Sequence, residues 1–373
     1  MAWGKRSDMI VHTVDPVNAE PSPAALAEHA LTGTDTFYMR NHGPIPDVDP
    51  QAWRLRVGGL VARPLELSLA DLRRDFAHHD VVAALQCAGN RRAELIRVRD
   101  IPGQVPWGPC ATSNARWTGA RLADVLAAAG IAAGAEHVAF AGLDVSDKPS
   151  PPQPFGGSIP LGKAIREEVL LAWAMNGRPL PRAHGAPVRV VVPGYLGARS
   201  VKWVVRVTVQ ACPSDNYFQA RDYRLLPADA DPSAAGPGAG LSLGPLAVNA
   251  AILTPDEGAR VPAGPVTVTG YAVAGDERQV ARVDVSADGG RSWEQARLEE
   301  EVSPWSWRRW RATVQLPPGH AEVIARAWDT AAGVQPENPA TVWNPQGYAN
   351  TAWSRVSFTA VQAGSPTPTA QLF

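Results

Sequence analysis

The sequence lacks the features that mark several large protein classes. Its three cysteines, Cys87, Cys110 and Cys212, form no CxxC pair, so we expect neither a zinc knuckle nor a disulfide framework, and a reducing compartment fits. No apolar run reaches the roughly 18 residues of a membrane span. The N-terminal segment MAWGKRSDMIVHTVDP has no apolar stretch after its basic residues and no twin arginine. We therefore expect a cytoplasmic protein, or a periplasmic one if a leader has been trimmed.

Charge of one sign is not in excess either. Lysine and arginine total 35, against 36 aspartate and glutamate residues. This balance argues against nucleic acid or an anionic membrane as the main partner. Any binding of anions must come from local clusters of basic residues.

Proline and glycine are abundant, at 35 and 33 residues, and the apolar segments are short and β-branched. This composition favours strands and loops with some helix, an α+β protein. A chain of 373 residues is long enough for two domains.

Three parts follow one another along the chain. Residues 1–35 are polar and interrupted by proline, which predicts an arm that wraps around the protein or frays. Residues 36–235 mix strands and helices, including a helix that starts after Ser68 with a capping-box spacing to Asp71 and a helix that ends at Gly130. The composition changes at residues 226–246, rich in small residues and proline. Residues 246–362 then contain short alternating strands, which predict an immunoglobulin-like sandwich.

The segment LQCAGNRR, residues 85–92, is the first candidate for chemistry. Cys87 leaves a buried strand into a glycine-containing loop, five residues before Arg92. Nearby positive charge lowers a thiol pKa and favours a metal ligand or a nucleophile. A cysteine that packs as a small hydrophobic residue is an equally good interpretation from the residue type alone.

Four further segments hold charged or aromatic side chains in constrained loops. Arg40 and His42 flank Asn41 beside two prolines and could bind an anion or cap loop carbonyls. Residues 182–203 bring basic residues and glycines to apolar strands, which suggests phosphate binding without a GxGxxG or Walker loop. The pair Asp222-Tyr223 could be surface decoration, and the strand SPWSWRRWR around Arg308 could be core or interface.

Together, in this order and spacing from about Phe37 to Arg355, these segments resemble the sulfite oxidase family of molybdenum enzymes. The likeness is greatest to the plant-type, haem-free members, and the chain contains no CxxCH haem motif. The resemblance implies a mixed α/β molybdopterin-binding catalytic domain over residues 36–235. It also implies that residues 246–362 form an immunoglobulin-like domain that mediates a homodimer.

The resemblance also assigns roles to residues. It implies that Cys87 binds molybdenum through its thiolate, and that other catalytic or substrate-pocket residues are Arg40, Arg92, Asp222, Tyr223 and Arg308, with Trp107 beside them. The pterin cofactor (molybdopterin) would be held by Tyr38, Met39, Arg40, Asn41, His42, Asp144, His184, Arg189, Ser200, Val201 and Lys202.

The implied reaction is the oxidation of sulfite to sulfate by oxo transfer from Mo(VI). Several guanidinium groups suit a compact dianion, and sulfur ligands suit a metal that changes oxidation state. Electrons would pass to an external acceptor, oxygen or a cytochrome, because the chain has no haem motif of its own.

One departure from the family pattern concerns the loop after NRR. Relatives have a basic residue before its glycine, whereas Pro102 precedes Gly103 in this chain. Arg97 or Arg99 could substitute, so the charge at the mouth of the pocket is open. Cys110 and Cys212 match no ligand position and are interpreted as structural.

Three other functions compete with sulfite oxidation. Nitrate reductases share the AGNRR segment, but they typically have Asn where this chain has Tyr223 and lack an arginine at the position of Arg308. A related oxidoreductase could instead act on another sulfur oxyanion. A plain adhesion or carbohydrate-binding module would explain the β domain but not the arginine clusters or the buried Cys87 loop.

Overall fold

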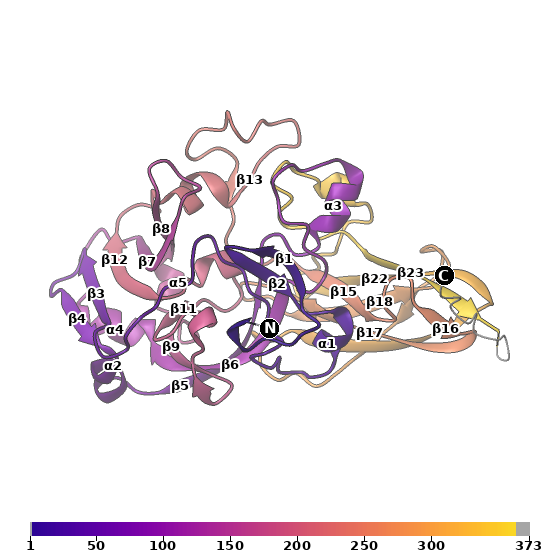
Figure 1. Ribbon diagram of the computed structural model, residues 1–373, viewed down its shortest axis with the longest axis horizontal. Coiled ribbons are helices and arrows are strands. Elements are labelled where there is room, and N and C mark those ends of the chain that lie inside the picture. The colour runs from indigo at the N-terminus through magenta and orange to yellow at the C-terminus, as the bar shows by residue number, and fades with distance from the viewer. Residues whose placement is uncertain (1, 363–373) are drawn as a thin grey trace.

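Two five-stranded sheets form the first unit of the protein in the computed structural model, which describes residues 2–362 (Figure 1). One sheet has the order β10-β9-β6-β5, with β11 also paired to β9, and all its pairings are antiparallel. Its strands are β5 (His79–Gln86), β6 (Thr112–Arg121), β9 (Leu170–Met175), β10 (Arg178–Pro179) and β11 (Arg189–Val191).

The second sheet has the order β4-β3-β12-β7-β8. Strands β3 and β12 are parallel, with Val57 opposite Val207, and the other neighbours are antiparallel. Apolar side chains of this sheet, among them Leu55, Val138 and Phe140, are buried in the main core of the first unit. The strands are β3 (Arg54–Gly59), β4 (Leu65–Ser68), β7 (His137–Ser146), β8 (Gln153–Pro160) and β12 (Val204–Gln210).

Helices in the first unit are short, and α4 buries Leu122, Val125 and Leu126 in the main core. The predicted capping box is present: Ser68 and Asp71 exchange side-chain and backbone hydrogen bonds at the start of α2. The predicted helix end at Gly130 is also present, with φ +73 at that glycine. The helices are α2 (Leu69–Asp75), α3 (Arg92–Val98), α4 (Leu122–Ala129), α5 (Leu161–Ala164) and a one-turn π-helix η4 (Phe218–Asp222).

The N-terminal segment, expected to wrap or fray, is folded against the first unit. It forms β1 (Ile10–Val14), β2 (Val17–Glu20) and α1 (Pro23–Ala27). The Glu20 carboxylate, 1% exposed, accepts hydrogen bonds from the backbone N–H groups of Gly108 (2.6 Å) and Cys110 (2.9 Å). These long-range bonds tie the segment to the loop that precedes β6.

The second unit is built from strands, in agreement with the sequence pattern. A four-stranded sheet, β15-β17-β21-β20, packs on a five-stranded sheet, β16-β23-β22-β18-β19, around a core that includes Val268, Val323, Trp310 and Phe358. The strands are β15 (Asn249–Thr254), β16 (Arg260–Pro262), β17 (Gly264–Val273), β18 (Val280–Ser286), β19 (Glu294–Gln295), β20 (Arg297–Leu298), β21 (Arg308–Leu316), β22 (Gly319–Asp329) and β23 (Ser354–Val361).

The linker region predicted at residues 226–246 is a loop that returns to the first unit. Strands β13 (Arg224–Leu225) and β14 (Leu241–Ser242) pair at its base. Arg199 of the first unit donates to the Leu243 carbonyl at 2.9 Å, just after β14. The second unit therefore starts at β15. Within residues 2–362 no helix is long and apolar enough to cross a membrane.

The NRR segment after Cys87 joins the two units. Arg91 is fully buried, and its guanidinium donates to Asn249 Oδ1 (2.9 Å), to the Ala352 carbonyl (2.7 Å) and to the Trp353 carbonyl (2.9 Å). Asn90 donates to the Tyr271 hydroxyl at 2.9 Å. Removing one partner of a buried charged network costs about 3–5 kcal/mol. The loop that presents Cys87 is thus fixed by the second unit.

Candidate active site

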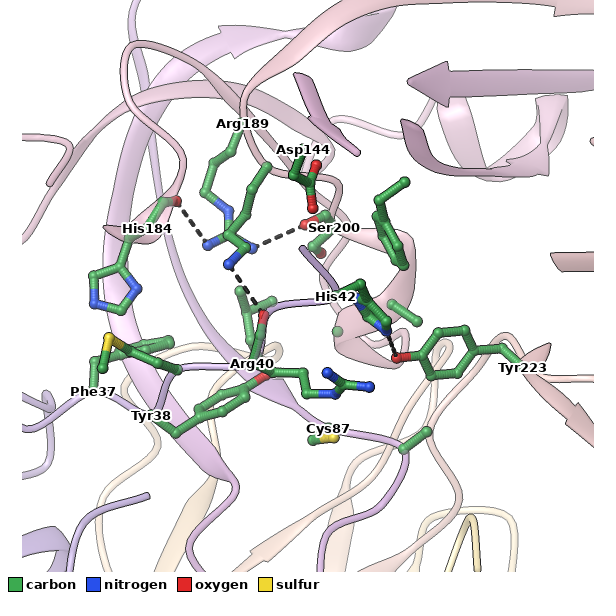
Figure 2. A pocket seen from close by; sticks show the side chains of 17 residues that line it. Phe37, Tyr38, Arg40, His42, Cys87, Asp144, His184, Arg189, Ser200 and Tyr223 are labelled. Atoms are coloured by element: carbon green, nitrogen blue, oxygen red, sulfur yellow. Dashed lines mark hydrogen bonds between the residues drawn. The ribbon is translucent and has the colours of Figure 1, made fainter. Parts of the chain in front are cut away.

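A pocket in the first unit brings together most of the residues that the sequence singles out (Figure 2). The space between its lining atoms is about 590 Å³, including the mouth that opens to solvent. Its predicted lining residues are Tyr38, Met39, Arg40, His42, Cys87, Asp144, His184, Arg189, Ser200, Lys202 and Tyr223, and Phe37, Leu85, Ala88, Phe155, Gly197 and Ala198 complete it.

Cys87 lies at one side of this pocket, directly after strand β5. Its backbone N–H donates to the Ala111 carbonyl at 2.8 Å, which fixes the start of the loop. The Gly89 N–H donates to the Cys87 sulfur at 3.4 Å. The Arg40 guanidinium lies between Cys87 and Tyr223 in Figure 2. Cys87 is a free thiol, 6% exposed, so a soft sulfur donor faces the pocket next to a fixed positive charge.

Tyr223 and His42 form the second side of the pocket. The His42 Nε2 and the Tyr223 hydroxyl are 2.7 Å apart, and the His42 ring stacks on Phe155 with centroids 4.4 Å apart. Burial, and then the positive charges of Arg40 and Lys148, hold the pKa of His42 well below its usual range. The imidazole is therefore neutral at pH 7, and burial likewise raises the pKa of Tyr223.

The third side of the pocket is rich in buried positive charge. Arg189 donates to the carbonyls of His184 (3.1 Å) and Ser200 (3.0 Å), and Lys202 donates to the Arg40 carbonyl (3.1 Å). Burial lowers the pKa of Arg189 to about 10 and that of Lys202 to about 7. Burial and the cations around it also hold the pKa of His184 well below its usual range. Arg189 and protonated Lys202 suit an anionic ligand, which would relieve their mutual repulsion.

The residues of the pocket fit the pterin cofactor that the resemblance implies. Asp144 is 3% exposed, and its Oδ1 has no hydrogen-bond partner among the described residues. Burial raises the pKa of Asp144 to about 7. A buried acceptor without a donor is costly, so it indicates a ligand that carries N–H groups, as a pterin does. The thiol, the unpaired acceptor and the cationic side would then bind metal, pterin and phosphate, respectively.

Two predicted cofactor residues lie beside the pocket but do not line it. Val201 is fully buried in the main core. Asn41 is also fully buried, and its amide donates to the Val17 carbonyl at 2.7 Å and accepts from Lys202. Asn41 therefore holds Lys202 in place.

Arg92, expected in the substrate pocket, points toward the second unit. Its Nε donates to the Gln346 and Gly347 carbonyls, each at 3.1 Å, and its Nη1 to the Val105 carbonyl at 2.9 Å. Gly89 makes room for it, because a Cβ at that position would lie 2.6 Å from Arg92 Cζ. Trp107, expected beside the pocket, is fully buried, and its ring lies against His12.

The structure does not bring Arg308 into the pocket. It lies in β21 of the second unit, where its Nη1 forms an ion pair with Glu301 Oε2 at 2.7 Å. Asp222 does not line the pocket either. It is 1% exposed next to Tyr223, and its carboxylate is bound by Lys148.

Sequence reasoning missed the residues through which the second unit reaches this region. The segment NPQGYAN, residues 344–350, brings Tyr348 against Tyr223, with the rings stacked at 5.3 Å and 18°. The Arg92 guanidinium lies 5.1 Å from the centre of the Tyr348 ring. Proline and glycine in this segment predict a turn, but nothing in the pattern tells which site the turn approaches.

Lys5 was missed for a similar reason. Its amine is buried and donates to the Phe37 carbonyl at 2.7 Å, and it lies 2.8 Å from His184 Nε2. Nothing in the sequence around Lys5 indicates that its amine is buried next to His184, because the segment was expected to wrap or fray.

Two family models match the chain. An oxidoreductase molybdopterin binding domain matches residues 42–218, and a Mo-co oxidoreductase dimerisation domain matches residues 242–361. The two matched ranges correspond to the two structural units.

Curated relatives and a solved structure agree with these matches. The chain is 46% identical to sulfite oxidase from Gallus gallus, over 92% of this chain and 76% of that protein. It is 41% identical to sulfite oxidase from Arabidopsis thaliana, over 93% of this chain and 92% of that protein. The sulfane dehydrogenase SoxCD from Paracoccus pantotrophus has a similar structure, with a TM-score of 0.78 and 26% identity, over 91% of this chain and 84% of that chain.

Proposed function

The chain belongs to the sulfite oxidase family of molybdopterin-binding oxidoreductases, and we propose that it oxidises sulfite to sulfate with a molybdenum cofactor held in the Cys87 pocket. One observation supports this most strongly. A buried thiol, a buried carboxylate oxygen without a partner in residues 2–362, and several buried basic side chains line the same pocket. Each matches a different part of a molybdenum–pterin cofactor.

Residues of three kinds would hold the cofactor. The Cys87 thiolate would bind the metal, Asp144 would accept from the pterin, and Arg189, Lys202 and His184 would face its phosphate. When bound, molybdenum accepts the two electrons that sulfite gives up and supplies the oxygen that makes sulfate. The redox chemistry belongs to the cofactor, whereas the protein orients it and binds the substrate.

Arg40, Tyr223 and His42 would act on the substrate side. Arg40 offers a guanidinium to a dianion, a strong and directional contact. Tyr223 keeps its proton because burial raises its pKa, so its hydroxyl donates a hydrogen bond to an oxygen of the substrate. His42 stays neutral and can accept from that hydroxyl, which orients it when the substrate is absent. The neutral His42–Tyr223 pair adds no charge to that of Arg40.

The wider architecture extends this proposal. The match of residues 242–361 to a dimerisation domain supports a homodimer formed through the second unit. Its two packed sheets suit an immunoglobulin-like arrangement of strands. Electrons would leave to an external acceptor, oxygen or a cytochrome. The cytoplasmic location stays a prediction, which cell fractionation would check.

A steady-state assay tests the proposal against its alternatives. Purified protein loaded with cofactor is given sulfite with oxygen, cytochrome c or ferricyanide as acceptor, and in parallel nitrate with a reduced dye or thiosulfate with ferricyanide. Sulfite-dependent reduction of an acceptor with stoichiometric sulfate supports the proposal. Nitrate reduction without sulfite oxidation, or turnover of thiosulfate alone, overturns it.

A further inference from the structure

Lys148 is the one well-exposed lysine of this chain. The sequence contains four lysines, Lys5, Lys148, Lys163 and Lys202. Lys5 and Lys163 are buried, and Lys202 lines the pocket, whereas the Lys148 side chain is 41% exposed. Its side chain is therefore accessible to a solute that arrives from solvent.

The position of Lys148 is set by two strands that both line the pocket. It lies in the loop of residues 147–152, between β7 and β8. Asp144 near the end of β7 and Phe155 near the start of β8 are lining residues. The charge of Lys148 also lowers the pKa of His42, another lining residue. Lys148 thus lies between two strands that line the pocket, close enough to His42 for its charge to act there.

A buried acid holds the Lys148 amine in this position. Its Nζ binds Asp222 Oδ1, and Asp222 directly precedes Tyr223 in the chain. Asp222 is 1% exposed, and its second oxygen has no hydrogen-bond partner among residues 2–362. An uncompensated carboxylate next to a site for a dianion would repel the dianion. The Lys148 ammonium offsets this repulsion next to the residue that precedes Tyr223, and its side chain remains 41% exposed.

The other candidate cations for the pocket mouth are engaged elsewhere. The Arg92 guanidinium is bound by backbone carbonyls, and Arg308 is paired with Glu301. The Arg99 guanidinium lies 3.3 Å from the centre of the Trp343 ring and donates to the Ala228 carbonyl at 2.5 Å. Arg40 lies deeper, among the lining residues. These contacts leave room for a further cation at the entrance.

We propose that Lys148 is the substrate-capturing cation at the mouth of the pocket, and that Asp222 is the positioning residue that holds its ammonium beside Tyr223. The proposal rests on sulfite, or an oxyanion of the same shape and charge, being the substrate. Lys148 acts on the arrival and binding of the dianion, and Arg40 and Tyr223 act on the bound substrate. A charge at the rim of a binding site mainly changes the association rate and its salt dependence.

Kinetics of the loaded enzyme give the first test. Lys148→Met should raise the KM for sulfite about three- to fivefold, the range of an exposed charge pair, with a smaller change in kcat. In this variant kcat/KM should also decrease less steeply as the ionic strength rises. Lys148→Arg should keep both parameters within about twofold, since it retains the charge. The matched control is Arg56→Met, which removes an exposed charge of β3 that is paired with Glu66 of β4.

These outcomes separate the proposal from the function on which it rests. If the unmodified protein does not oxidise sulfite, the proposed function fails. If it does, and Lys148→Met has the KM and salt dependence of Arg56→Met, only the role of Lys148 fails. Equal losses in kcat and molybdenum content would show a structural role and would also overturn it.

A second test does not depend on turnover. The unmodified holoenzyme is acetylated with an amine-reactive ester, and peptides that contain Lys148 are quantified by mass spectrometry with sulfate or with chloride at matched ionic strength. Sulfate should slow acetylation of Lys148 several-fold and leave the N-terminal amine unaffected. Equal rates for Lys148 in sulfate and chloride would contradict the proposal.

Discussion

The Tyr348 ring of the second unit stacks on the Tyr223 ring of the first, with centroids 5.3 Å apart and planes 18° from parallel. Tyr348 is 2% exposed and Tyr223 is 3% exposed. The hydroxyl end of Tyr223 is held as well, because it lies 2.7 Å from His42 Nε2. The second unit thereby helps to set the position of a pocket-lining side chain.

Replacing Tyr348 should affect both stability and turnover. Tyr348→Ala removes a buried ring, which costs about 3 kcal/mol of the free energy of unfolding, and it frees Tyr223 to move. We expect kcat for sulfite to fall more than KM rises. Tyr348→Phe keeps the ring and should leave both quantities close to those of the unmodified protein. Denaturant unfolding and steady-state kinetics measure them, and equal kinetics for the two variants would show that the stack does not position Tyr223.

Arg40 and Arg308 should differ sharply in their effect on sulfite binding. Arg40 lines the pocket, so Arg40→Met should raise the KM for sulfite about tenfold or more, the value of a charge-assisted hydrogen bond. Arg308 is paired with Glu301 away from the pocket, so Arg308→Met should change KM less than about twofold. Steady-state kinetics with molybdenum content as the control decides this. A larger loss for Arg308→Met would restore the placement that the sequence resemblance suggests.

Because His42 is buried, we expect the folded protein to lose stability in mild acid. Its pKa in the folded protein is lowered by burial and by Arg40, Lys148 and Lys202, whereas in the unfolded chain it is about 6.5. Between these two values only the unfolded chain binds the proton, so stability falls as pH drops below about 6.5, by up to about 1.4 kcal/mol per pH unit. His42→Gln should show a shallower fall between pH 7 and 5. Parallel pH profiles of thermal unfolding for the two proteins would contradict this.

Thiol reactivity should follow the burial of the three cysteines. Cys212 is exposed, whereas Cys87 and Cys110 are buried. Burial, and then the nearby Glu20, raises the pKa of the Cys110 thiol well above its usual range, which makes it less reactive still. The native protein should react quickly with about one equivalent of a thiol reagent and the unfolded protein with three. Cys212→Ser should abolish the fast phase and leave sulfite oxidation unchanged, and a fast phase that persists in this variant would contradict the assignment.

Local signals predicted the elements that need only neighbouring residues. The capping box at Ser68 and Asp71 and the helix end at Gly130 both occur as expected, because they depend on residues a few positions apart. The strand that ends before Cys87 was predicted by its apolar run. The short N-terminal strands were not, since their stability comes from distant contacts such as Glu20 with the Gly108 and Cys110 amides.

The same difference explains what could be predicted of the pocket. Motifs that resemble a known family indicated Cys87, Asp144 and Arg189, and the structure places all three in one pocket. The resemblance also suggested Arg308, which lies elsewhere. Lys148 and Tyr348 lie in loops. Turn residues predict the local conformation of such a loop but not which distant residues it contacts. Such contacts between distant loops require the folded structure.

If the Cys87 pocket holds molybdenum and uses it to oxidise sulfite, activity must follow the amount of bound metal. The most direct measurement is the rate of sulfite oxidation per chain, plotted against molybdenum content for preparations loaded to different extents. We expect a straight line through the origin, with Cys87→Ser at the origin because it lacks the soft thiolate ligand. Turnover that does not depend on molybdenum, or full activity in Cys87→Ser, would contradict this expectation.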